Sequence, residues 1–126
     1  MNREELISWL LDGDPAIRWQ TMRDLQGVPA AHWQAEQQLT LTEGWGAQLL
    51  ALQAADCSWG GGIYSPKWIS TTYTLLTLCA IGIPHDHEPA QKAAALVLDK
   101  QLGPACDDLF RRNLAACDRC IVGMDL

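Results

Sequence analysis

Three of the five cysteines lie near the C-terminal end of the sequence, at a spacing that could bind a metal ion. Cys117 and Cys120 form a Cys-x2-Cys pair, and Cys106 precedes them. A structural zinc site needs four ligands, and neither a second cysteine pair nor a histidine pair follows in the sequence. We therefore interpret these cysteines as buried, reduced thiols and predict no metal ion. Cys106, Cys117 and Cys120 are the candidate ligands if one is bound.

Two other groups of polar residues could do chemistry. Residues 85–88 read His-Asp-His-Glu, but they lie between a Gly-x-Pro turn and Pro89, so they are explained as the polar start of a helix. Asp107 and Asp108 are adjacent acids that suit the N-cap of a following helix. The sequence contains no nucleophile elbow, no phosphate-binding loop and no paired catalytic carboxylates. It predicts no catalytic residue and no cofactor.

Length and composition limit the remaining classes. The chain has 126 residues, of which 48% are hydrophobic, so we expect one helical domain spanning residues 1–126. A formal charge of -6 argues against a nucleic-acid partner. The apolar stretch at residues 6–11 is too short for a signal peptide or a membrane span. An odd number of cysteines without framework spacing favours reduced thiols and a cytoplasmic location.

The elements that must position these residues are all predicted to be helices, because no segment alternates with period two. Apolar spacing, capping residues and Gly or Pro stops predict helices over residues 4–11, 16–25, 31–41, 44–53, 71–81, 90–102 and 107–116. The apolar end at residues 120–126 indicates the start of another. The predicted class is all-α, with seven or eight helices in hairpins.

One helix and one loop stand out in this pattern. The helix at residues 71–81 is apolar on most sides, which predicts that it is buried. The loop at residues 54–68 is long and rich in glycine and aromatic residues. Loops of this length in small domains are functional or are ordered by their own side chains. We expect Trp59, Tyr64 and Trp68 to hide their surface by folding back on the flanking helices.

Residues 53–61, Gln-Ala-Ala-Asp-Cys-Ser-Trp-Gly-Gly, resemble the glutamine-tryptophan repeat of the squalene-cyclase and prenyltransferase family. The matching residues are Gln53, Trp59, Gly60 and Gly61. In that family the glutamine side chain caps a neighbouring helix terminus and the tryptophan covers it. The resemblance implies an α/α toroid and a structural role for these residues.

The resemblance covers about the first eighty residues. Residues 14–20 and 60–75 also look like bacterial squalene-cyclase-like proteins. Cys57 occupies the place of a glycine that normally takes a positive φ in the turn. The turn is therefore either strained or of another type.

The departures from the family concern its catalytic sites. The cyclase acid motif Asp-x-Asp-Asp is absent, because Asp107 and Asp108 lack the outer acid. Residues 118–120 resemble the Asp-x-Cys element of the prenyltransferase zinc site, but no histidine follows His87 to complete it. We therefore expect no complete catalytic site in this chain.

Two functions remain. The first is a non-catalytic scaffold with an apolar groove lined by Trp59, Tyr64, Trp68 and Tyr73, for an isoprenoid or for a partner helix. The alternative is a fragment or subunit of an isoprenoid cyclase or prenyltransferase-like enzyme, which is completed by further hairpins or by a partner chain.

A homodimer is also expected, because a toroid of this family closes its ring with more hairpins than this chain encodes. The apolar C-terminal residues have no glycine cap and no basic last turn, whereas helical repeats need polar outer caps. A two-fold interface would include part of the helix at residues 71–81 and the C-terminal segment with Ile121, Val122, Met124 and Leu126.

Overall fold

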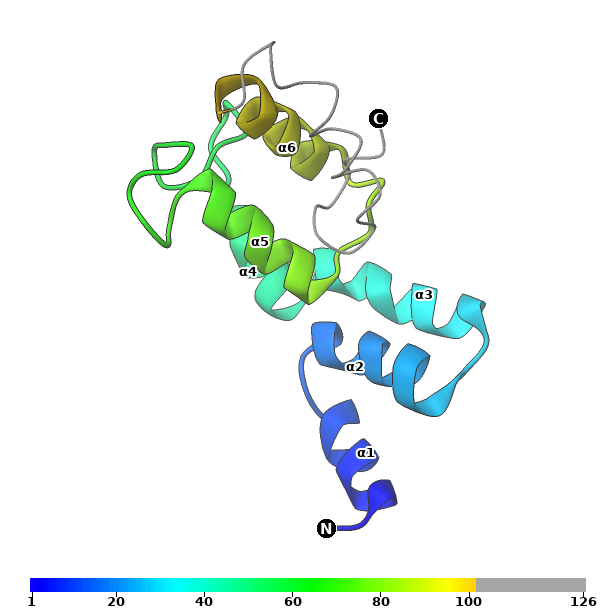
Figure 1. Cartoon of the computed structure of the whole chain (residues 1–126). Helices are drawn as coiled ribbons and strands as arrows, with labels where there is room; N and C mark the ends of the chain where they lie inside the picture. The colour runs from blue at the N-terminus through cyan, green and yellow to red at the C-terminus, as the bar shows by residue number, and fades with distance from the viewer. Residues whose placement is uncertain (102–126) are drawn as a thin grey trace.

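A computed structural model describes residues 1–101 as α-helices joined by short turns and one long loop (Figure 1). The α-helices are α1 (Arg3–Leu11), α2 (Pro15–Thr21), α3 (Ala30–Gln38), α4 (Gly44–Ala51), α5 (Thr71–Ile81) and α6 (Glu88–Gln101). A π-helical turn, Met22–Gln26, continues α2, and a 3-10 turn, Leu39–Leu41, continues α3. Within residues 1–101 no strand occurs beyond one isolated bridge between Trp59 and Gly62, so the all-α class is confirmed there.

The helix starts follow from local capping. Asn2 and Glu5 form a capping box at the start of α1. Asp14 accepts a hydrogen bond of 2.9 Å from the Ala16 N–H, and Pro15 occupies the first turn of α2, as the sequence predicted. Gly82, at φ 74°, ends α5 in the left-handed conformation.

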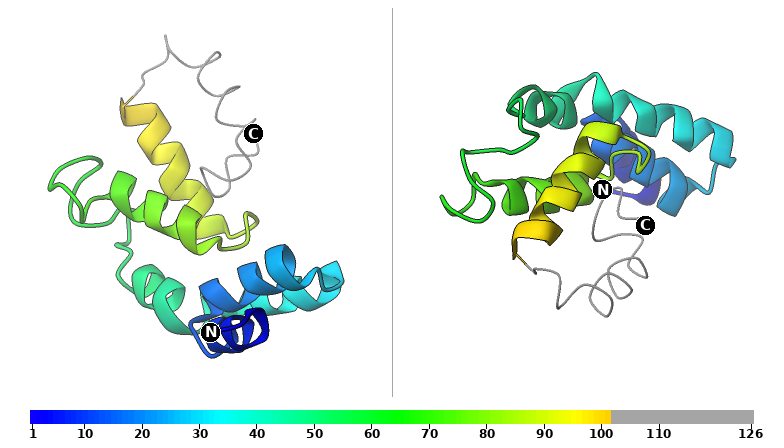
Figure 2. Two further views of the ribbon diagram at one scale, coloured as in Figure 1. Left: turned by 60° about the horizontal axis from the view of Figure 1, so that its bottom comes forward. Right: turned by 90° about the horizontal axis from the view of Figure 1, so that it is seen from above.

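The first helices form a hairpin. α2 and α3 lie side by side, and α1 packs on α2 (Figures 1 and 2). Arg18 of α2 forms a salt bridge with Glu36 of α3, a second one with Glu43 at 3.5 Å, and a hydrogen bond of 2.9 Å to the Gly13 carbonyl. These half-buried contacts fix the hairpin to the turn before α4.

The main core lies where α5 packs against α4 and α6 (Figure 1). Its buried members are Ala16, Trp59, Leu75, Leu78, Ile81, Ile83, Ala90, Ala93, Ala94 and Leu98. Alanines on α6 have small side chains, so α6 can approach α5 closely. The long loop, residues 52–70, joins α4 to α5 and contributes Trp59 to this core.

The prediction that α5 is buried is confirmed for one side of the helix and not for the other. Leu75, Leu78 and Ile81 are buried, but Leu76 is 54% exposed and Thr77 and Ala80 are exposed too. The physical reason is that α4 and α6 cover one side of α5, and the opposite side has no helix of the described part over it. Leu76 is the large apolar side chain that α5 exposes on this side.

Several predictions fall on residues that the structure does not describe. The helix at 107–116, the C-terminal apolar segment, and Cys106, Cys117 and Cys120 all lie outside residues 1–101. The full helix number and the toroid therefore stay predictions. Among the described helices, none combines the length and the apolar character that crossing a bilayer requires.

Candidate functional site

Gln53 and Trp59 connect three elements of the fold. The Trp59 side chain is 2% exposed, and its indole N–H donates a hydrogen bond of 2.7 Å to the Leu49 carbonyl of α4. The Gln53 side-chain amide donates bonds of 3.0 Å to the carbonyls of Cys57 and of Pro89, which lies in the first turn of α6. These bonds tie the end of α4 and the loop to the start of α6.

The turn between them has the strained form. Cys57 takes φ 70°, a conformation that L-residues other than glycine rarely adopt. Asp56 stabilises this turn by accepting hydrogen bonds from the Ser58 hydroxyl, at 2.6 Å, and from the Ser58 N–H, at 3.0 Å. The hydroxyl bond is the main reason that the pKa of Asp56 lies below its ordinary value. Of the two possibilities for Cys57, the strained turn is the one observed, because Cys57 takes the positive φ that glycine normally takes at this place.

The first two of the three glycines that follow Trp59 differ in what requires glycine there. Gly60 takes φ 64°, and a Cβ there would clash with the Ile69 carbonyl, so this position needs both the backbone freedom and the space of glycine. Gly61, at φ 76°, has nothing close to its hydrogen atoms. Close packing of the loop on itself therefore fixes Gly60 and also Gly62, where a Cβ would clash with the Ser65 carbonyl, but not Gly61.

The loop base, which we define as Trp59, Ser70 and Thr71, is held by buried hydroxyl groups. The Thr71 hydroxyl accepts from the Trp59 N–H at 2.9 Å and donates to the Gly62 carbonyl at 2.8 Å. The Ser70 hydroxyl donates to the Tyr64 carbonyl at 2.7 Å. Both side chains are fully buried. The sequence did not predict this bracing of the loop.

The aromatic patch, which we define as Tyr64, Trp68 and Tyr73, lies on the outside of the same loop. The Tyr73 ring centroid is 5.3 Å from that of Tyr64 and 5.1 Å from that of Trp68. The hydrogen bond with Tyr64 raises the pKa of Tyr73. Tyr64 is 52% exposed and Trp68 is 72% exposed.

The structure thus brings together three of the four residues that the sequence predicted for a groove. Trp59 is separate, because it is buried in the core between α4 and α5. The expectation that Tyr64 and Trp68 hide their surface is wrong. The loop is ordered through Trp59 and through hydrogen bonds to its own carbonyls, so its other aromatic side chains are left at the surface.

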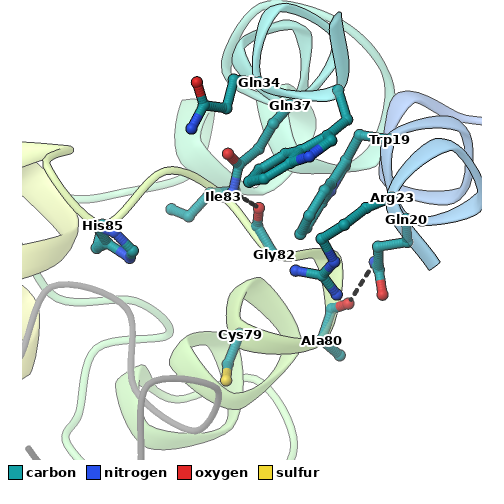
Figure 3. Close-up of a pocket in the computed structure, with 11 residues that line it drawn as sticks. Trp19, Gln20, Arg23, Gln34, Gln37, Cys79, Ala80, Gly82, Ile83 and His85 are labelled. Atoms are coloured by element: carbon teal, nitrogen blue, oxygen red, sulfur yellow. Dashed lines mark hydrogen bonds between the residues drawn. The ribbon is translucent and has the colours of Figure 1, made fainter. Parts of the chain in front are cut away.

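A second cluster, which sequence reasoning did not predict, borders a cavity of about 330 Å³ at the C-terminal end of α5 (Figure 3). The Trp19 and Trp33 rings lie 5.7 Å apart, and the Arg23 guanidinium lies 4.4 Å from the Trp19 ring centroid. Arg23 also forms a salt bridge of 2.7 Å with Asp24. The lining residues are Trp19, Gln20, Arg23, Trp33, Gln34, Gln37, Cys79, Ala80, Gly82, Ile83 and His85.

The polar groups of this cluster cap a helix. The Trp19 indole N–H donates to the Ile81 carbonyl at 3.0 Å. The amides of Gln20 and Gln37 donate to the carbonyls of Ala80, at 3.1 Å, and Gly82, at 2.9 Å (Figure 3). These carbonyls end α5 and have no partner within the helix. The polar contacts of the cluster therefore have a structural role. The Trp-Gln pair at positions 19–20 is the one sequence signal that could have indicated it.

The described residues hold no group of three or more histidine, cysteine, aspartate or glutamate side chains that could bind a metal ion. Around residues 85–88, burial lowers the pKa of His87. Burial also raises the pKa of the Cys79 thiol, which disfavours the thiolate that a metal or a nucleophilic reaction would need. The three cysteines predicted as candidate ligands are not among the described residues.

Comparisons of the chain with protein-family models, with curated proteins and with solved structures gave no match.

Proposed function

We propose that this chain is a non-catalytic helical binding module that holds the aromatic patch at the surface for contact with an apolar partner. The observation that carries the proposal is Trp68, a large apolar side chain that is 72% exposed on a backbone at φ 73°. A left-handed conformation costs a non-glycine residue about 1–2 kcal/mol. A costly conformation that displays an indole to solvent is typical of a recognition site.

The rigidity of the loop supports this proposal. Thr71 and Ser70 fix the loop base by buried hydrogen bonds, and Tyr73 supports the patch from α5. A pre-organised aromatic surface loses little conformational entropy when a partner binds. Binding therefore gains most of the free energy of burying the indole.

The shape of the patch bears on the partner. A small ligand such as one isoprenoid chain is enclosed over most of its surface in its site. The patch is open, with Tyr64 and Trp68 both more than half exposed, so an extended apolar surface fits it better than a single isoprenoid.

Family membership, the incomplete toroid, the homodimer and the cytoplasmic location belong to the same proposal. The contacts of Gln53 and Trp59 with α4 and α6 support the structural role that the squalene-cyclase resemblance implies. The exposed Leu76 supports a dimer contact on α5. The cytoplasmic location rests on the odd number of cysteines. The alternative is a fragment or subunit of a cyclase-like enzyme. Its active site would need residues after Gln101 together with further hairpins or a partner chain.

The test is retention on a hydrophobic-interaction column. We expect the double variant Trp68→Ala/Ile69→Ser to elute clearly earlier than the wild type while melting at the same temperature. The matched control is Trp9→Ala, because Trp9 is 64% exposed but lies on α1, away from the loop. Equal retention of the wild type and the double variant would contradict the proposal.

A further inference from the structure

The part of the loop that follows Asp56, together with α5, is nearly free of charge in an acidic protein. The chain has fifteen acidic and nine basic residues, yet residues 57–84 contain no acid and a single basic residue, Lys67. Lys67 lies beside the aromatic patch, with its ammonium 5.0 Å from the Trp68 ring centroid. Residues 57–84 therefore carry one positive and no negative side chain of their own.

The side chains at the end of the loop form a mixed set, and we define the loop tip as Tyr64, Lys67, Trp68 and Ile69. All four are exposed. Trp and Tyr combine an apolar ring with one polar group and prefer the interface between acyl chains and headgroups. A lysine stem can lie along apolar surface while its ammonium reaches the phosphate layer. This combination suits the surface of a bilayer.

Several backbone carbonyls of the loop have hydrogen-bond partners within the protein. The carbonyls of Gly62, Ile63 and Tyr64 accept hydrogen bonds from the hydroxyls of Thr71, Thr72 and Ser70, as described for two of them above. The Pro66 carbonyl accepts from the Ser70 N–H at 3.2 Å. Unpaired backbone groups are a main cost of moving a loop out of water, and at these four carbonyls that cost is reduced.

The loop is also convex. It projects beyond the helices in two views (Figures 1 and 2), and its Trp68 side chain is 72% exposed. A projecting tip can enter a fluid interface, whereas docking on a second protein would need a matching groove.

We infer that the loop tip inserts into the interfacial layer of an anionic phospholipid bilayer, with Trp68 and Ile69 among the upper acyl carbons and Lys67 at the headgroup phosphates. This inference rests on the proposed function and names its partner. The chain lies on the membrane through one loop and does not span it. One loop with one cation gives reversible binding, since stable anchoring takes two signals.

The test is co-sedimentation with vesicles of phosphatidylcholine, with and without phosphatidylglycerol. We expect binding to the mixed vesicles, and at least about tenfold weaker partition for Trp68→Ala/Ile69→Ser, because two large apolar side chains leave the interface. Lys67→Gln should weaken binding about fivefold on the anionic vesicles only. Trp9→Ala is the matched control and should bind as the wild type does.

A second measurement locates the indole. Lipids brominated on the acyl chain should quench the tryptophan fluorescence of the wild type more than that of Trp68→Phe, which keeps the apolar ring but removes this indole. Equal quenching of the two proteins would overturn the inference, as would equal vesicle binding of the wild type and the double variant.

Two outcomes separate this inference from the proposed function. If the wild type is retained on the hydrophobic column through the patch but does not bind vesicles, the bilayer is wrong and the binding module stands. If light scattering shows a dimer that Trp68→Ala converts to a monomer, the occupant of the patch is a second copy, and the bilayer inference fails. If column retention does not depend on the patch, the proposed function fails first.

Discussion

The loop base and the loop tip use the same residue type in opposite ways. Trp59 is buried, and its indole N–H is bonded to the Leu49 carbonyl, whereas Trp68 is exposed beside Lys67. Both lie in one loop, Trp59 between Ser58 and Gly60 and Trp68 between Lys67 and Ile69. What separates them is the backbone: Trp59 is anchored by Thr71, and Trp68 is turned outward by its positive φ. Burial in this loop follows hydrogen bonding more than hydrophobicity.

The largest effect is expected at the base. Trp59→Ala should lower the free energy of unfolding by about 3–5 kcal/mol, because it removes a buried aromatic side chain from the core and leaves a cavity. Urea denaturation followed by circular dichroism measures it. Trp68→Ala is the control and should change stability by less than about 0.5 kcal/mol. Similar losses at the two positions would remove the distinction between base and tip.

Thr71→Val should lower the free energy of unfolding by about 1–3 kcal/mol, because it keeps the shape but leaves the Trp59 N–H and the Gly62 carbonyl without the hydroxyl. Thr77→Val is a matched control on the same helix, since the Thr77 hydroxyl is exposed and bonds the Tyr73 carbonyl of its own helix. The same denaturation experiment compares them. If Thr71→Val is as mild as Thr77→Val, the loop does not depend on this brace.

Cys57→Gly should raise the stability by about 0.5 kcal/mol, since relief of the left-handed strain exceeds the added freedom of the unfolded chain. Cys57→Ala keeps the strain and should leave stability nearly unchanged. Thermal melts of the three proteins test this. A loss of stability in Cys57→Gly would show that the turn does not take a positive φ at this residue.

The smallest effect concerns pH. The folded pKa of Asp56 is lowered from 3.8, so its contribution is fully present above that value and is lost as pH falls through the folded pKa. We expect the melting temperature of Asp56→Asn to depend less on pH below 4 than that of the wild type. Ser58→Ala should have the same effect, because its hydroxyl is the main cause of the shift. Parallel melting curves for all three proteins would contradict this assignment.

The helices and their ends could be predicted from the sequence because they depend on neighbours in the chain. Asp14 with Pro15, and Gly82 after an apolar run, act within one turn, and the structure places these ends accordingly. The exposed side of α5 could not be predicted from residue types, because Leu75 and Leu76 are both leucine. The position of α4 and α6 decides that Leu75 is buried and Leu76 is exposed.

The candidate site was predictable in part for the same reason. Gln53 and Trp59 stand at a recognisable spacing, and the structure places them in contact with α6 and α4. The exposure of Trp68 depends on its backbone conformation, which residue types do not specify. The contact of Gln37 with Gly82 joins residues far apart in the chain and depends on how α3 meets the end of α5.

The cap on α5 has a consequence for how the protein responds to its solvent. Helix C-termini are commonly stabilised by lysine or arginine, and α5 has no basic residue in its last turn. Its final carbonyls are bonded instead by one indole and two amides, from Trp19, Gln20 and Gln37, which carry no net charge and do not titrate. Counterions weaken interactions between charges, and the three donors at this helix end are uncharged. The junction between the first hairpin and α5 should therefore keep its strength in concentrated salt, where the exposed ion pair between Lys92 and Glu88 loses its own.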